Sequence, residues 1–170
     1  GGEIFHDLAI EGNYAFVAAG SAGLQVYNVS VPGKPLISSS VVDAAGESVT
    51  LAGNAVAVAV QGDYAYVALD AVDEYAIHYD SLVVLDISDP STLRVVRELG
   101  YSLNRADYYN GGGRSIFVQG SLVAITIDVL KDIVPDTEVV DADFAKGLLQ
   151  LINIGDVSDP ASVPEVLLNA

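Results

Sequence analysis

The 170-residue sequence contains no cysteine, no methionine and no tryptophan, and it has only 7 lysine and arginine residues against 23 aspartate and glutamate residues. Without cysteine the chain can form no disulfide, hold no cysteine-ligated zinc and present no thiol nucleophile. Its net charge of −16 repels nucleic-acid phosphates and anionic lipid surfaces. We therefore expect neither a nucleic-acid partner nor thiol chemistry.

Long apolar runs are also missing. The longest covers residues 55–60, which is the length of one strand, whereas a membrane-spanning helix needs about 20 apolar residues. We therefore expect no membrane span in this chain. Because methionine is absent even at position 1, we expect the chain to be a processed, trimmed or partial product. The acidic, cysteine-free composition favours an extracellular or cell-surface setting, or the periplasm.

The sequence does contain an internal repeat. The stretch Gly12–Ala18 recurs almost unchanged as Gly62–Ala68, and we align a third, diverged copy at Gly113–Val118. Runs that alternate apolar and polar residues, separated by glycine-containing turns, predict antiparallel strands joined by hairpins. We expect about four strands in each repeat unit, and the units cover approximately residues 8–42, 56–99 and 103–168.

The end of each repeat is also recognisable. Leu82–Pro90 closes the second copy with Asp-Ile-Ser-Asp-Pro, Asn28–Pro32 closes the first, and we place the third at Asp156–Pro160. Together with Gly62–Ala68, this pattern resembles the LVIVD repeat, a β-propeller-type repeat of bacterial and archaeal surface and secreted proteins. The resemblance implies a propeller fold and an exported setting. It brings no shared catalytic residues.

We predict a single all-β domain over residues 1–170, built as a β-propeller-like arc of about three four-stranded antiparallel blades. Closed propellers have about 4–8 blades, so further chain or a partner must complete the arc. An arc also leaves strand edges and apolar faces open. A β-sandwich or barrel is the alternative architecture.

Acidic residues gather in two insertions that separate the second and third strands of the later units. Carboxylates are the hard oxygen ligands that Ca²⁺ prefers, so calcium is the candidate cofactor, and no other is indicated. No EF-hand or nonapeptide pattern is present, and solvated acidic loops explain the same residues. The candidate ligands are Asp70, Asp73, Glu74, Asp80, Asp136, Asp141 and Asp143.

Aromatic and cationic residues mark two candidate binding segments. The first combines His78 with neighbouring tyrosines, and the second precedes the glycine triplet of the third unit; tyrosine and arginine are enriched at recognition surfaces. The alternatives are an ordinary loop histidine and tyrosines that pack against the next unit. The candidate binding residues are Tyr75, His78, Tyr79, Arg105, Tyr108 and Tyr109.

These observations favour a non-catalytic, exported or cell-surface module with a structural or adhesive role. Its expected partner is protein, including further copies of the chain, because open strand edges and apolar faces invite strand addition and packing. We assign no catalytic residue. The alternative function is a calcium-dependent propeller hydrolase of the lactonase or phytase type that uses the acidic insertions.

Overall fold

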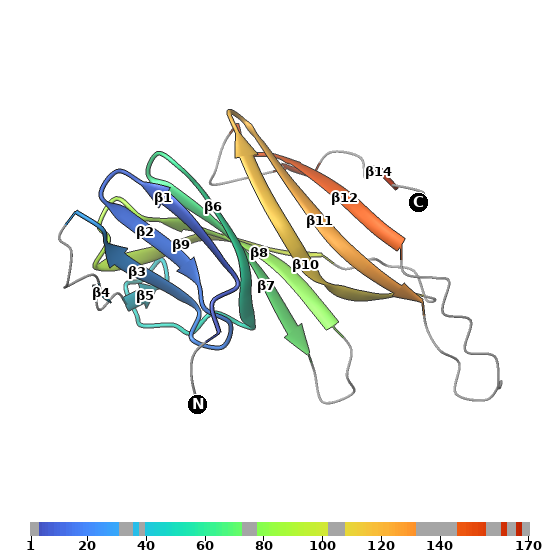
Figure 1. Ribbon diagram of the computed structural model, residues 1–170, viewed down its shortest axis with the longest axis horizontal. Coiled ribbons are helices and arrows are strands. Elements are labelled where there is room, and N and C mark those ends of the chain that lie inside the picture. The colour runs from blue at the N-terminus through green and yellow to red at the C-terminus, as the bar shows by residue number, and fades with distance from the viewer. Residues whose placement is uncertain are drawn as a thin grey trace.

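The computed structural model describes residues 4–30, 36–37, 40–72, 78–101, 108–131, 146–155, 161–162 and 166–167. Within these ranges the chain forms strands and turns but no helix, which confirms the all-β prediction. Three sheets follow one another along the chain, and the second lies between the other two (Figure 1). The described ranges accordingly include no helix able to span a membrane.

We call the sheets A, B and C in chain order. Sheet A is antiparallel and keeps the chain order of β1 (Asp7–Glu11), β2 (Tyr14–Ala18), β3 (Leu24–Asn28) and β4 (Leu36–Ile37). Sheet B contains β5 (Ser40–Val42), β6 (Asn54–Gln61), β7 (Tyr64–Val72), β8 (His78–Asp86) and β9 (Thr92–Tyr101). Sheet C contains β10 (Tyr108–Gln119), β11 (Leu122–Lys131), β12 (Lys146–Asn153), β13 (Ala161–Ser162) and β14 (Val166–Leu167).

Two of the sheets depart from a plain four-stranded meander. In sheet B the order is β5-β9-β8-β7-β6, because the segment that arrives from sheet A adds β5 in parallel to the outer strand β9. In sheet C the fourth position is shared by the short strands β13 and β14, which both pair with β12. An added strand satisfies backbone groups that an edge strand leaves open, so β5 protects that edge of sheet B.

Sheet B is buried on both faces because its side chains alternate between two hydrophobic cores. Successive side chains of a strand point to opposite faces, so a sheet covered on both sides needs nearly continuous apolar strands. Each large apolar side chain buried in this way stabilises the fold by roughly 1.5–3 kcal/mol. Residues Ala65, Val67, Leu69, Val83 and Leu85 pack towards sheet A, whereas Tyr66, Ala68, Leu82 and Val84 pack towards sheet C.

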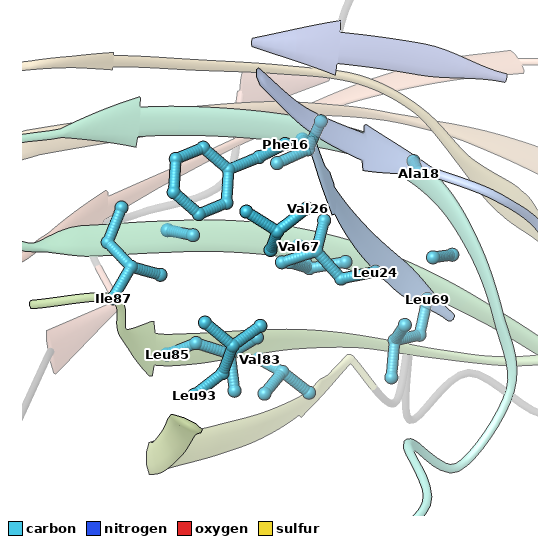
Figure 2. Packing of buried hydrophobic residues seen from close by; sticks show 13 residues of the cluster. Phe16, Ala18, Leu24, Val26, Val67, Leu69, Val83, Leu85, Ile87 and Leu93 are labelled. Atoms are coloured by element: carbon cyan, nitrogen blue, oxygen red, sulfur yellow. The ribbon is translucent and has the colours of Figure 1, made fainter. Parts of the chain in front are cut away.

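Figure 2 shows the core between sheets A and B. Phe16 and Val26 come from sheet A and meet Val67 and Leu85 of sheet B, while Leu93 of β9 extends the core toward the outer edge. All five side chains are buried. This packing fixes sheet A on sheet B without any disulfide.

Backbone contacts also connect sheets A and B along their inner strands. The Asp7 carboxylate accepts a hydrogen bond of 3.0 Å from the N–H of Val58 on β6. Gly20 and Ala55 exchange two backbone hydrogen bonds of 3.0 and 2.9 Å. Because β6 has no strand beyond it in sheet B, these bonds occupy donors and an acceptor on its free side.

The first two long strands of each sheet join through the same two-residue turn. Its first residue is a glycine with a left-handed φ, which is +57° at Gly12, +59° at Gly62 and +58° at Gly120. The alignment of the third copy at Gly113–Val118, which made Gly113 the equivalent of the turn glycines Gly12 and Gly62, is therefore wrong, because Gly113 lies inside β10 and pairs with Ile127. The β10 ladder passes through the glycine triplet by shifting register on either side of Gly113, as a bulged strand does.

Two further hydrogen bonds recur in all three sheets. The carbonyl of the second turn residue accepts the N–H of the residue that follows the third strand, at 2.8 Å for the pairs Asn13 and Val29, Asp63 and Ile87, and Ser121 and Ile154. In addition, the side chain of the last residue of the third strand accepts a hydrogen bond from the backbone N–H two residues later. The distances are 3.0 Å for Asn28 and Ser30, 2.9 Å for Asp86 and Ser88, and 2.8 Å for Asn153 and Gly155. The repeat end of sheet C is thus at Asn153–Gly155, whereas the predicted segment Asp156–Pro160 lies outside the described residues.

The Ser-Asp-Pro turn after β8 has its own side-chain bonds. The Asp89 carboxylate accepts hydrogen bonds from the hydroxyl of Ser91 at 2.7 Å and from its N–H at 3.0 Å. The hydroxyl bond is the largest of the effects that hold the pKa of Asp89 below its ordinary value. The turn thereby ends β8 and starts β9 at Thr92.

Candidate interaction surfaces

The predicted calcium ligands fall partly on strands. Asp70 and Asp80 are direct partners in the β7–β8 ladder, so these two residues lie on strands and not in the first of the two predicted insertions. Strand pairing continues beyond them, since residues 71–72 pair with residues 78–79 in the same backbone ladder. The remaining candidates lie outside the described residues; they are Asp73, Glu74, Asp136, Asp141 and Asp143.

Among the described residues, no group of three or more histidine, aspartate or glutamate side chains is placed to hold a metal ion. The strand ends nevertheless have the arrangement expected for equivalent insertions. The turns at Gly62 and Gly120 lie together, and β7 and β11 both run away from them, so their far ends emerge on the same side of the sheets (Figure 1). Calcium binding by the two insertions stays a prediction.

The predicted binding residues also lie largely on strands. His78 and Tyr79 open β8 opposite Val72 and Ala71, whereas Tyr108 and Tyr109 open β10 opposite Lys131 and Leu130. The four residues therefore belong to two different sheets and not to two loops. The other two candidates, Tyr75 and Arg105, lie outside the described residues.

A different feature stands out in the structure: the outer face of sheet A, which points away from sheet B. On β1, Leu8 and Ile10 are 60% and 58% exposed. Their cross-strand neighbours on this face are Val17 and Ala15 of β2, and Tyr27 of β3 pairs with Ala15 in turn. Ala15 and Val17 are each only 8% exposed, and Val17 pairs with Gln25 of β3, so the apolar area that stays open on this face is that of Leu8 and Ile10 on β1.

Sheet C carries a matching apolar surface on the side that points away from sheet B. Phe117 of β10 is 61% exposed and pairs with Ala124, while Leu122 is 40% exposed. The half-buried residues Leu149 and Leu151 continue the surface on β12, where Leu151 pairs with Ala124. We call these two surfaces the A face and the C face.

The turn bonds define which residues of the three sheets are equivalent, because Asn13, Asp63 and Ser121 occupy the same place. Three residues further along are Phe16, Tyr66 and Ala124, and their cross-strand partners are Ala9, Ala59 and Phe117. Every sheet thus has one aromatic residue opposite one alanine at this place. Phe16 and Tyr66 are each 1% exposed because the next sheet covers them, and Phe117 is the one left open.

The equivalent position on the opposite face of each sheet shows the same contrast. Ile10 corresponds to Val60 and Val118, and Leu8 corresponds to Val58 and Ile116, counted back from the turn glycines. Val58 is 3% exposed and Ile116 is 8% exposed, since each faces the preceding sheet. The A face is therefore the side that a preceding sheet covers in sheets B and C.

A polar contact joins sheets B and C next to the hydrophobic core. The side-chain amide of Gln61 donates to the Gly120 carbonyl at 2.8 Å, and its carbonyl accepts the Gly120 N–H at 2.8 Å. The residue just before a turn glycine in one sheet thus binds the turn glycine of the next. The equivalent residues are Glu11 in sheet A and Gln119 in sheet C, and Gln119 is exposed.

A shallow pocket of about 310 Å³ lies between the β2–β3 turn, β5 and the segment that leads into β6. Four hydroxyl side chains line it, and no charged or aromatic side chain does. A small neutral ligand fits such a lining better than an ion. The hydroxyl residues are Ser21, Ser40, Ser48 and Thr50.

Sequence patterns did not single out the A face, the C face or Gln61. Alternation in β1 and β10 indicates which residues share a face, yet it does not tell which face another sheet covers. The one sequence signal for the Gln61 contact was the dipeptide Gln-Gly, which occurs at residues 61–62 and again at residues 119–120.

Comparison with protein families gives a match to the LVIVD repeat, which covers residues 4–43 and 52–98, just over half of the chain. The two matched segments correspond to sheet A with β5 and to sheet B. A search of curated proteins found no match.

Proposed function

Because the chain belongs to the LVIVD-repeat family, we propose that it is a non-catalytic, propeller-like module that binds protein in an exported or cell-surface setting. In this proposal sheets A, B and C are three successive blades of a propeller arc, and the A face and C face are its two open ends. The role is structural or adhesive. The acidic, cysteine-free composition supports the exported setting.

The observation that carries the proposal is the pair of open apolar faces at the two ends of the arc. Leu8, Ile10 and Phe117 are each more than half exposed, although their equivalents in the neighbouring sheets are buried or half-buried. Contiguous apolar surface of this kind is typical of protein interaction sites.

Capture of binding proteins tests the proposal. The immobilised chain is incubated with an extract of surface and secreted proteins from its source, and bound proteins are identified by mass spectrometry. Two face variants, Ile10→Lys and Phe117→Lys, place a charge on the A face and the C face. Val49→Lys is the matched control, because Val49 is 36% exposed but lies on neither face.

We expect the unmodified chain and Val49→Lys to retain the same partner, or further copies of the chain itself, and at least one face variant to lose it. Circular dichroism of each variant checks that the sheets remain folded. Binding that survives both face variants unchanged would refute the use of these faces. A chain that retains no protein at all would refute the proposed function.

A further inference from the structure

We propose that the partner of the C face is the A face of a second copy of this chain, docked head to tail, with Gln119 of one copy bound to Gly12 of the next. This inference rests on the proposed function and names its partner. It requires three things of the molecule: that the internal contacts repeat in one direction, that the two faces match those contacts, and that Gln119 has a counterpart.

The contacts between the sheets do repeat in one direction. The face with Phe16 in sheet A packs against the face with Val67 in sheet B, and the equivalent Tyr66 face of sheet B packs against the Ile125 face of sheet C. Val67 and Ile125 each lie four residues after the second turn residue, so the same two faces meet both times. Contacts in which two different surfaces meet propagate from unit to unit until they close on themselves.

The two open faces are the next pair in this series. The C face contains Phe117 and Ala124, the equivalent of the covered pairs in the other sheets. The A face contains Ala15 and Val17, which are equivalent to Ala65 and Val67 in sheet B. A second copy that placed its A face on the C face would therefore repeat a contact that the chain already makes twice.

The polar contact, which the chain makes once between sheets B and C, points in the same direction. Gln61 of sheet B binds both backbone groups of Gly120 in sheet C. The next step in the series joins Gln119 to the turn glycine of the following sheet, which is Gly12 of a second copy. Gly12 is exposed, has a left-handed φ of +57° and has the same open space around it as Gly120, so it resembles the glycine that Gln61 binds. Glu11 cannot make the same two bonds to Gly62, because a carboxylate has no N–H to donate.

Two copies supply six sheets, a number within the range of about 4–8 blades that closes a propeller. Both open faces are then covered, because each copy uses its C face on the other's A face. Phe5 already contacts Tyr27 on the A face, with ring centroids 6.3 Å apart, and leaves Leu8 and Ile10 exposed beside it. For the 170-residue chain by itself, the inferred particle is a closed pair of twice 17.7 kDa.

Sedimentation equilibrium of the 170-residue chain tests this inference with one variant for each face. Ile10→Arg blocks the A face and Phe117→Arg blocks the C face; both residues are exposed, so the fold tolerates the change. We expect the unmodified chain to form the pair and each variant alone to be monomeric. An equimolar mixture of the two variants still has one intact A face and one intact C face, so we expect it to form a one-to-one complex.

The same experiment separates the alternatives. A pair formed by Ile10→Arg alone would mean that two C faces meet, and one formed by Phe117→Arg alone would mean that two A faces meet; either result overturns the head-to-tail contact. A chain that stays monomeric at all concentrations overturns the second copy as partner. That last result leaves the proposed function standing wherever the face variants still abolish capture of another protein.

Gln119→Ala tests the polar part of the contact. The loss of two hydrogen bonds is expected to raise the dissociation constant of the pair about tenfold. Ser115→Ala is the matched control, since Ser115 is an exposed polar residue of the same strand and face but lies away from the turn. Equal dissociation constants for the two variants would overturn the Gln119–Gly12 contact.

Discussion

Replacing Gly62 with alanine measures how much stability the protein loses when a residue other than glycine must adopt the left-handed backbone conformation of this turn. At φ +59° an alanine is disfavoured by about 1–2 kcal/mol relative to its usual backbone regions. No atom lies within 4 Å of the new methyl group, so steric collision adds nothing to this cost. Asparagine adopts the left-handed region more readily, and we expect Gly62→Asn to lose less than half as much stability as Gly62→Ala.

Urea unfolding followed by circular dichroism measures the effect. With a slope of about 2 kcal/mol per molar urea, Gly62→Ala should lower the midpoint by roughly 0.5–1 M. Gly12→Ala and Gly120→Ala should lower it by the same amount, because φ and the open space are the same at the three positions. Equal midpoints for Gly62→Ala and Gly62→Asn would refute the backbone explanation, and an unaffected Gly120→Ala would refute the equivalence of the third turn.

Three further predictions concern the core and two titrating groups. Leu85→Ala removes a fully buried side chain and should lower the free energy of unfolding by about 2–5 kcal/mol, whereas Leu122→Ala on the open C face should cost less than about 1 kcal/mol. Burial raises the pKa of Tyr66, so the folded state loses stability as the pH rises through the tyrosine range near about 10; Tyr66→Phe should flatten unfolding curves measured above that pH. The pKa of Asp89 is lowered by its bonds to Ser91, so its contribution is present above the unfolded-state pKa and is lost as the pH falls through the folded-state pKa; Ser91→Ala should raise the pKa of Asp89 in a carbon-detected NMR titration.

The sequence was sufficient for the all-β class and for two of the three turns. Gly12 and Gly62 stand in nearly identical stretches, so period-two alternation around them located β1, β2, β6 and β7. The third turn was misplaced because Gly113 is followed by an apolar run that imitates the others. The left-handed Gly120, the β10–β11 ladder and the backbone hydrogen bond from Ile154 to Ser121 identify the true turn, and none of them has a sequence pattern of its own.

The candidate sites were harder to predict for a physical reason. Acidic and aromatic residues such as Asp70 and His78 interrupt an apolar pattern, which reads as a loop, yet the backbone ladder of β7 and β8 pairs regardless of which side chains it carries. The open faces could not be predicted because residue type does not show which apolar face of a strand another sheet covers. Val58 and Leu8 are both apolar strand residues, and only the order of the sheets in space makes one buried and the other exposed.

The position of the aromatic residue indicates where a head-to-tail contact would be centred. In sheets A and B the aromatic is on the second strand, at Phe16 and Tyr66, whereas in sheet C it has moved across the strand pair to Phe117 on β10. First strands are neighbours within the chain, since β6 lies beside β1 and β10 beside β6. A following sheet A would therefore bring β1 to β10, and β1 is the strand that carries the exposed Leu8 and Ile10. In the proposed contact the large side chain on one face would lie opposite the most open strand of the other, which is why charge substitution of Phe117 and Ile10 should separate two copies.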